Sequence, residues 1–177
     1  MRIRNPSEIA LNKRIKKFNK TIKIPGDKSC SIRALLLASQ CMGISEIKNL
    51  LESEDVLNCA RALKNSLGVK IVKKNDIYYV YGNGLNSFKT KKKLTKIYVG
   101  NSGTTARLIS GLLSTQENKF YIHGDKSMNR RDMSRIINPL EKIGCFFYPK
   151  NKTTLPLIIE GTSMPLAQKH IEKKGTC

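Results

Sequence analysis

The residues best suited to chemistry are polar groups that come directly before an apolar stretch, in the segment GDKSCSIRALLLAS that begins at Gly26. Lys28, Ser29 and Arg33 supply an ammonium, a hydroxyl and a guanidinium group. A helix N-terminus leaves backbone N–H groups unpaired and carries a partial positive charge, and Gly26 allows a tight turn before it. The segment therefore predicts an anion site that suits a phosphate group. Taken alone, a turn followed by a Ser-capped helix explains the pattern equally well.

A second segment of similar composition, GNSGTTARLISGLLS, begins at Gly100. Two further matches follow, one where a helix-like segment ends in glycine and one where a strand-like segment ends in glycine. The matched pairs are Gly26 with Gly100, Gly68 with Gly144 and Gly82 with Gly161, separated by 74, 76 and 79 positions. Three matches in the same order indicate an internal repeat whose spacing grows through small loop insertions.

Each repeat contains segments with the composition of strands. In the first repeat we expect strands at 21–26 and 44–50 and a hairpin made by 69–74 and 77–82. In the second repeat the corresponding segments are 96–100, 120–124, 145–150 and 155–161. With the helices between them, each repeat has the order β-α-β-α-β-β. The sequence therefore predicts an α/β fold.

Helices are expected between these strands, because their apolar residues recur with the 3.6-residue period. A helix from about Lys28 should end at Gly43, and one from about Ser53 should end at the C-cap Gly68. Their expected buried faces are Ile32, Leu35, Leu36 and Ser39, and Val56, Cys59, Ala60, Leu63 and Leu67. The second repeat should carry a helix from about Gly103 and another with Met133, Ile136, Ile137, Leu140 and Ile143 inward, bent at Pro139. The acids Glu52, Glu54 and Asp55 are interpreted as first-turn residues.

Composition excludes several classes of protein. The longest uncharged stretch, 34–45, is too short and too polar to cross a membrane, and no signal-peptide core follows Met1. The five cysteines show no CxxC spacing, which predicts reduced thiols, mostly in the core, of a cytoplasmic protein. With only His123 and His170 present, we expect no histidine-based metal or triad site, and no cofactor.

The chain is strongly basic, with 33 Lys and Arg against 13 acidic residues and a formal charge of +20. Nucleic-acid binding is one explanation of this charge. However, the lysines are densest in the loop 89–96, Trp is absent, and no aromatic-basic RNA-recognition motif is present. A general lysine bias together with an anionic small substrate explains the charge as well.

Three longer motifs resemble one known family. The segments GDKSCSIRALL, GNSGTTARL and GDKSMNRRDMSRIINPL are similar to motifs in the N-terminal part of the 5-enolpyruvylshikimate-3-phosphate synthases, also called 3-phosphoshikimate 1-carboxyvinyltransferases. The segments NLLESEDV and LPLIIEG are also in register, so that the resemblance covers roughly 21–161. Three motifs in order are far more specific than one glycine-rich loop.

The resemblance implies a particular architecture, the inside-out α/β barrel of the enolpyruvyl transferases, with two domains of three β-α-β-α-β-β units and the active site between them. Residues 1–20 would lead in from the other domain, and 21–177 would form part of the shikimate-3-phosphate-binding domain. Within it, unit 1 would span about 21–84, a Lys-rich linker 85–94, unit 2 about 95–161 and a tail 162–177. A third unit and most of the second domain would be missing. The complete enzyme is expected to be monomeric.

The resemblance also implies roles for individual residues. The enzyme would transfer the enolpyruvyl group of phosphoenolpyruvate to the 5-hydroxyl of shikimate 3-phosphate, in aromatic amino acid biosynthesis. The residues implied to contact shikimate 3-phosphate are Lys28, Ser29 and Arg33, and those implied at phosphoenolpyruvate are Lys28, Asn101, Gly103 and Arg131. Lys28 and Arg131 are the catalytic candidates, while Arg107 is interpreted as structural.

Three positions depart from the family pattern. Ile32 replaces His or Asn, Ser102 replaces Ala, and Asp132 replaces Pro directly after Arg131, where an acid would oppose an anionic ligand. These departures bear on affinity. The family's proton-transfer residues would lie in the missing domain, so that the chain alone is expected to be inactive.

Two alternatives remain at this point. One is a non-catalytic basic α/β module that binds anions or RNA. The other is a relative of the UDP-N-acetylglucosamine enolpyruvyl transferases, which carry Lys-Asn where this chain has Lys28-Ser29. That family also places a Cys in the loop that here reads GDKSMNRRD, which contains none.

Overall fold

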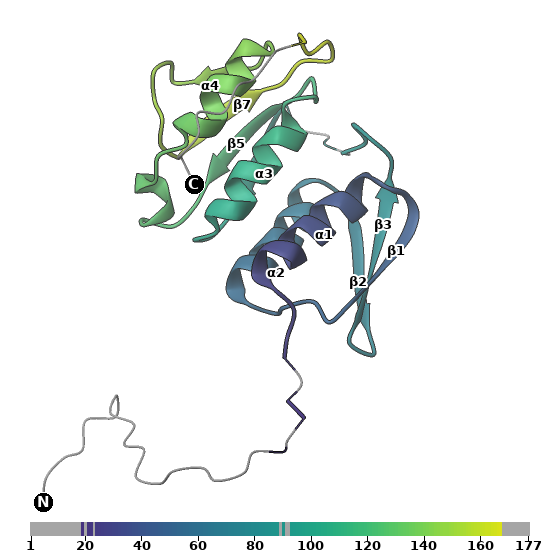
Figure 1. Cartoon of the computed structure of the whole chain (residues 1–177). Coiled ribbons are helices and arrows are strands. Elements are labelled where there is room, and N and C mark those ends of the chain that lie inside the picture. The colour runs from purple at the N-terminus through teal and green to yellow at the C-terminus, as the bar shows by residue number, and fades with distance from the viewer. Residues whose placement is uncertain (1–18, 20, 23, 89, 91–92, 168–177) are drawn as a thin grey trace, which may run out of the picture.

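The computed structural model describes residues 19, 21–22, 24–88, 90 and 93–167. In Figure 1 these residues form two helix-and-sheet modules that lie side by side. The first module contains α1 (Lys28–Gln40), β1 (Met42–Lys48), α2 (Glu54–Arg61), the π-helical turn η1 (Ala62–Ser66), β2 (Lys70–Lys74) and β3 (Ile77–Asn83). The second contains β4 (Leu94–Tyr98), α3 (Gly103–Leu113), β5 (Lys119–His123), the 3-10 turn η2 (Met128–Arg130), α4 (Ser134–Lys142), β6 (Phe146–Tyr148) and β7 (Leu157–Glu160).

The two sheets have three strands in the same order, and the second sheet has one more strand, β4, at its edge. The first sheet has the order β1-β3-β2 and is antiparallel throughout. The second has the order β4-β5-β7-β6, in which β4 and β5 are parallel and the other pairs antiparallel. The second module therefore shows the expected β-α-β-α-β-β order. In the first module, the described residues before α1 form no strand, so the strand expected at 21–26 is not observed there.

The repeated glycines at the ends of β3 and β7 have the same structural cause. A Cβ atom on Gly82 would lie 2.1 Å from the carbonyl oxygen of Cys41, just after α1. A Cβ atom on Gly161 would lie 2.4 Å from the carbonyl oxygen of Gln116, just after α3. In both modules the strand end thus packs directly on the backbone that leaves the helix, where only glycine fits.

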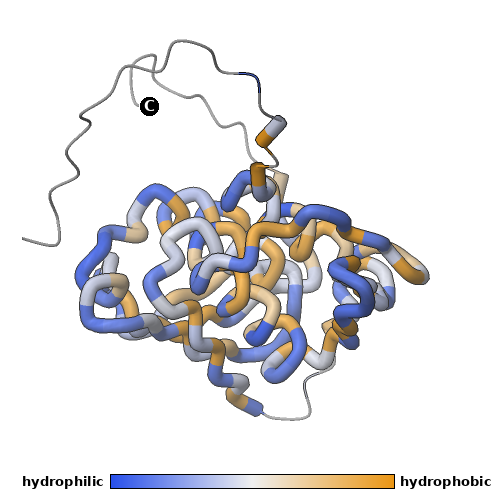
Figure 2. The backbone as a smooth tube through the Cα atoms, turned by 90° about the horizontal axis from the view of Figure 1, so that it is seen from below, coloured by the Kyte–Doolittle hydropathy of each residue, from blue (hydrophilic) through white to orange (hydrophobic). Residues whose placement is uncertain are grey.

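The core lies between the helices and their sheets. α1, α2 and α3 pack against one another and join the modules into one apolar core. Ile32, Leu35, Leu63, Ile109 and Leu113 are completely buried, as their helical spacing predicts. Figure 2 shows hydrophobic residues gathered toward the middle of the molecule and hydrophilic residues mostly around the periphery. Ile32, which departs from the family pattern, is completely buried in this core.

Several local expectations differ from the structure. α1 ends at Gln40, and Gly43 lies inside β1 with φ 91°, so that Gly43 does not end the helix. The second helix continues as a π-turn over Ala62–Ser66 before Gly68, at φ 71°, ends it. Pro139 lies inside α4, as expected. Cys59 and Cys145 are buried, but Cys30 and Cys41 are exposed and do not fill the core.

None of the helices in the described part of the chain is long and apolar enough to span a membrane.

Candidate anion-binding site

Asp27 caps the first helix of the predicted anion site. Its carboxylate accepts a hydrogen bond from the Cys30 backbone N–H at 2.7 Å. This hydrogen bond holds the pKa of Asp27 below its usual value. The expected alternative, in which Ser29 caps the helix, is therefore wrong. Gly26 is required just before the cap, because a Cβ atom there would lie 2.3 Å from the Asn49 carbonyl oxygen.

Lys28 lies in the first turn of α1 and pairs with an acid from α2. Its Nζ atom is 3.0 Å from Oδ2 of Asp55, and the Lys28 side chain is 49% exposed. Asp55 is indeed in the first turn of α2, as expected, but its pairing with Lys28 has no sequence signal. Glu52, by contrast, precedes α2 and contacts Lys73 and the Tyr78 hydroxyl, so it is not a first-turn acid.

The N-terminus of α3 has a buried cap of its own. Ser102 is completely buried, and its Oγ accepts from the Thr105 backbone N–H at 3.2 Å while donating to Thr105 Oγ1 at 2.8 Å. The hydroxyl that departs from the family pattern is therefore committed to the helix cap.

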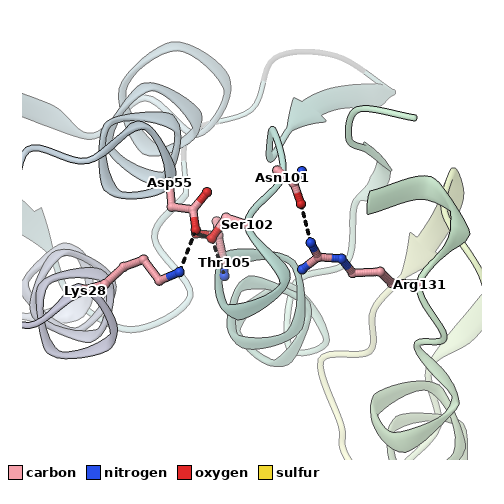
Figure 3. A network of polar contacts seen from close by, with 6 residues as sticks. All are labelled: Lys28, Asp55, Asn101, Ser102, Thr105 and Arg131. Atoms are coloured by element: carbon pink, nitrogen blue, oxygen red, sulfur yellow. Dashed lines mark hydrogen bonds and ion pairs between the residues drawn. The ribbon is translucent and has the colours of Figure 1, made fainter. Parts of the chain in front are cut away.

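Arg131 and Asn101, predicted as neighbours at one substrate, do lie together. A guanidinium nitrogen of Arg131 donates to the side-chain oxygen of Asn101, as Figure 3 shows. Arg131 follows the turn η2, and its backbone N–H donates to the Met128 carbonyl at 3.1 Å. Since Met128 is completely buried, this short turn anchors the arginine to the core.

Gly103, the first residue of α3, provides space for two guanidinium groups. A Cβ atom there would lie 2.8 Å from Nη1 of Arg107 and 3.2 Å from Nη1 of Arg131. The sequence predicts that Gly103 lets a ligand approach the backbone. The structure shows, in addition, that its missing side chain leaves room for these two arginines.

Asp132 lies beside this group, but its carboxylate is turned toward Ser134. Its oxygens accept from the Ser134 hydroxyl and, at 3.3 Å, from the Ser134 backbone N–H. The hydrogen bond from the Ser134 side chain holds the pKa of Asp132 below its usual value, with a smaller effect of the Arg107 charge. Arg107 itself donates to the backbone carbonyl of Asp132 at 3.1 Å.

Sequence reasoning missed Asn58, which supports the loop of the second repeat from α2. Its side chain accepts from Arg61 at 2.9 Å, while the buried amide nitrogen Nδ2 has no partner among the described residues. A Cβ atom on Gly100 would lie only 2.1 Å from that nitrogen, and Gly100 has φ 60°. Gly100 is thus needed both for its conformation and for this close approach.

The remaining predicted residues lie near the same end of α1 without joining these contacts. Ser29 is half-buried, and no side-chain hydrogen bond is found for it within the described chain. Arg33 is exposed and borders an apolar groove between α1 and α3, beside Leu36 and Leu108. The structure therefore brings Lys28 with Asp55 and Asn101 with Arg131 to the N-terminal ends of three helices, as Figure 3 shows. Arg33 takes no part in these contacts.

This arrangement is suited to binding anions. Three helix N-termini, an ammonium group and several guanidinium groups all favour negative charge. Within the described ranges, no group of three or more His, Cys, Asp or Glu side chains is placed to hold a metal ion. The fold and the site together define an α/β protein of two similar helix-and-sheet modules, with a polar group of residues suited to an anion at its helix ends.

Comparison with known proteins identifies the family. The family model "EPSP synthase (3-phosphoshikimate 1-carboxyvinyltransferase)" matches residues 12–176. The chain belongs to this family.

Individual relatives agree with the family model. A 3-phosphoshikimate 1-carboxyvinyltransferase of Ruthia magnifica subsp. Calyptogena magnifica is 44% identical over 140 residues, covering 79% of this chain and 31% of the relative. One from Oenococcus oeni is 41% identical over 149 residues, covering 84% and 33%. The solved EPSP synthase of Acinetobacter baumannii is similar with a TM-score of 0.71 and 35% identity, over 79% of this chain and 31% of that one. The chain thus spans about a third of the length of these relatives.

Proposed function

We propose that this chain forms part of the binding site for phosphoenolpyruvate and shikimate 3-phosphate in enolpyruvyl transfer. The observation that carries the proposal is that polar side chains of both repeats lie around the start of α3 (Figure 3). Lys28 of the first repeat pairs with Asp55, and Arg131 of the second donates to Asn101 just before α3. Two anionic substrates that must react with each other need positive charge from both sides of one site.

The two repeats are proposed to divide the substrates between them. In the first, Lys28, Ser29 and Arg33 would hold shikimate 3-phosphate at the start of α1. In the second, Asn101, Gly103 and Arg131 would hold phosphoenolpyruvate at the start of α3. Lys28 would contact both substrates, since its ammonium group can donate in three directions from a flexible stem. The family membership and the identities of these residues support this division.

In the proposed reaction the 5-hydroxyl oxygen of shikimate 3-phosphate bonds to C2 of phosphoenolpyruvate while C3 takes up a proton. The hydroxyl proton is then removed, C3 gives up a proton, and the C2–O bond to phosphate breaks. Lys28 and Arg131 would stabilise the negative charge of both substrates during these steps. We expect the proton-transfer groups in the part of the family fold that this chain does not span. We further propose a cytoplasmic location and, for the complete enzyme, a monomer.

The +20 charge also fits an alternative function, that of a basic module that binds RNA or other anions non-specifically. Such binding would depend on many dispersed surface lysines. The proposed site depends on a few residues at the helix ends. The two accounts therefore predict different responses to local substitution.

The test is a titration of the 177-residue chain with shikimate 3-phosphate, with a single-stranded RNA and with UDP-N-acetylglucosamine. A variant carrying Lys28→Ala, Ser29→Ala and Arg33→Ala should lose shikimate 3-phosphate binding and retain RNA binding. A control that replaces the exposed Lys96 by Ala should change neither. Unchanged shikimate 3-phosphate binding in the triple variant, or tighter binding of the uridine nucleotide, would overturn the proposal.

A further inference from the structure

Three arginines surround one open cavity beside the second repeat. Arg107 on α3, Arg131 after η2 and Arg135 in the first turn of α4 line a cavity of about 680 Å³, together with Asp132 and Ile136. Arg131 is predicted to contact substrate from its motif. Arg107 is expected to be structural, and Arg135 has no role in the account so far.

The positive charge of this cavity is poorly neutralised. Among the described residues, no carboxylate oxygen lies within 4.0 Å of a guanidinium nitrogen of Arg107, Arg131 or Arg135. The acid nearest in sequence, Asp132, turns its carboxylate to Ser134. The polar partners of the arginines are neutral, namely the Asn101 side-chain oxygen and the Asp132 backbone carbonyl. Three guanidinium groups beside a single carboxylate, that of Asp132, leave a net positive charge, and a bound anion reduces their mutual repulsion.

Two of the three arginines, Arg107 and Arg131, also meet near one point. Nη1 of Arg107 and Nη1 of Arg131 flank the position of the absent Gly103 side chain, at 2.8 and 3.2 Å. That position is the first residue of α3, an 11-residue helix whose first backbone N–H groups favour negative charge. A purely structural Arg107 would need only its bond to the Asp132 carbonyl, which uses one of its nitrogens.

We propose that Arg107, Arg131 and Arg135 together bind one phosphate or carboxylate group, so that Arg107 and Arg135 are ligand-contacting residues and not structural ones. This inference rests on the proposed function, because it assigns the cavity to one anionic end of the substrate that Arg131 contacts. Arg107 should contribute more than Arg135, because Arg107 is half-buried while Arg135 is exposed and its charge is better screened. Bidentate contact with a planar or tetrahedral anion is a task to which guanidinium groups are suited.

The experiment is a calorimetric and NMR titration of the 177-residue chain with inorganic phosphate and, separately, with pyruvate. The first ligand represents a phosphate group and the second a carboxylate group, so that their ranking identifies the chemical group that the cavity takes. We expect Arg107→Gln to weaken binding of the preferred anion about tenfold and Arg135→Gln about threefold. Arg107→Lys, which retains the charge but not the bidentate geometry, should fall between the wild type and Arg107→Gln.

Two controls test whether weaker anion binding in the Arg107 and Arg135 variants results only from a lower net charge or from unfolding. Arg130→Gln removes a neighbouring exposed charge that does not line the cavity, and it should change affinity by less than about twofold. Thermal unfolding should show that each variant is folded. Anion affinity that is equal in Arg107→Gln, Arg135→Gln and Arg130→Gln would overturn the proposal. Retained shikimate 3-phosphate binding at Lys28 would in that case leave the proposed function standing.

Discussion

Lys28 and Asp55 form an ion pair, with 3.0 Å between the ammonium nitrogen and a carboxylate oxygen, across the first turns of α1 and α2. The pair places an acid directly beside the ammonium group that is proposed to bind two anions. Asp55 both orients Lys28 and competes with any anion for its charge. The Lys28 side chain is also half-exposed, so that its ammonium group is partly open to solvent.

We predict that Asp55→Asn raises the affinity for shikimate 3-phosphate about threefold, because it removes a competing negative charge from Lys28. Stability should fall only slightly, by about 0.5 kcal/mol, since the pair is exposed. Isothermal titration and denaturant unfolding measure the two effects. The control is Glu54→Gln, which removes another first-turn acid of α2 that has no described ion pair. Equal affinity changes in the two variants would show that the Lys28–Asp55 contact has no specific role.

Gly103→Ala tests the space that two arginines share. The added methyl group would lie 2.8 Å from Arg107 Nη1 and 3.2 Å from Arg131 Nη1, so both guanidinium groups must shift. We expect about tenfold weaker phosphoenolpyruvate binding with no loss of stability, because the ends of arginine side chains are flexible.

Gly111→Ala is the matched control for that substitution. Gly111 is in the same helix, and an added Cβ atom there meets nothing within 4 Å. The control should raise stability by up to about 1 kcal/mol without changing affinity. Equal ligand binding by the Gly103→Ala variant and the wild type would contradict the assigned geometry.

The Asp27 cap of α1 should make the stability of the fold depend on pH. Folding lowers the pKa of Asp27 below its usual value of 3.8, mainly through the hydrogen bond from the Cys30 backbone. Its contribution to stability is therefore present above pH 3.8 and is lost as the pH falls through the lower folded pKa. Asp27→Asn keeps a capping oxygen and should remove this part of the acid dependence in urea unfolding curves. Identical acid dependence in the variant and the wild type would mean that Asp27 does not carry it.

The cysteines should differ in reactivity. Burial raises the pKa of Cys59 to about 12, and it also raises the pKa of Cys145. Cys30 and Cys41 are exposed. At pH 8 we expect iodoacetamide to modify the exposed pair rapidly and the buried pair only after unfolding, as peptide mass spectrometry can measure. Rapid modification of Cys59 in the folded chain would contradict the packing of α2.

Much of the fold follows from the sequence because its signals are local. The helical period of Ile32 and Leu35 predicts the buried face of α1, and Gly82 and Gly161 mark equivalent strand ends. Features that depend on long-range contacts are not predictable in this way. A strand at 21–26 fits the local composition, but a strand also requires a partner along β1, and composition does not report pairing.

The site shows the same division between local and long-range signals. Motif resemblance predicts Lys28, Asn101 and Arg131, because each is part of a contiguous pattern. The partners of these residues come from other elements, as Asp55 does from α2, and no short spacing marks them. Ser102 and Asp132 depart from the family pattern in ways that bear on affinity, and hydrogen bonds turn both side chains toward their own loops. The orientation of these two side chains depends on local cap geometry, and a comparison of residue types alone does not predict it.

The most direct test of the central claim is an amide NMR titration of the 177-residue chain with shikimate 3-phosphate. We expect binding no tighter than roughly millimolar, about 4 kcal/mol, with shifts concentrated at 26–33 and weakening as salt increases. Lys28→Ala should reduce the affinity about tenfold, because it removes a charge-assisted hydrogen bond from the helix end. Lys96→Ala should leave it unchanged. Equal shifts for the wild type and Lys28→Ala would contradict the account, because the start of α1 would then not be the site.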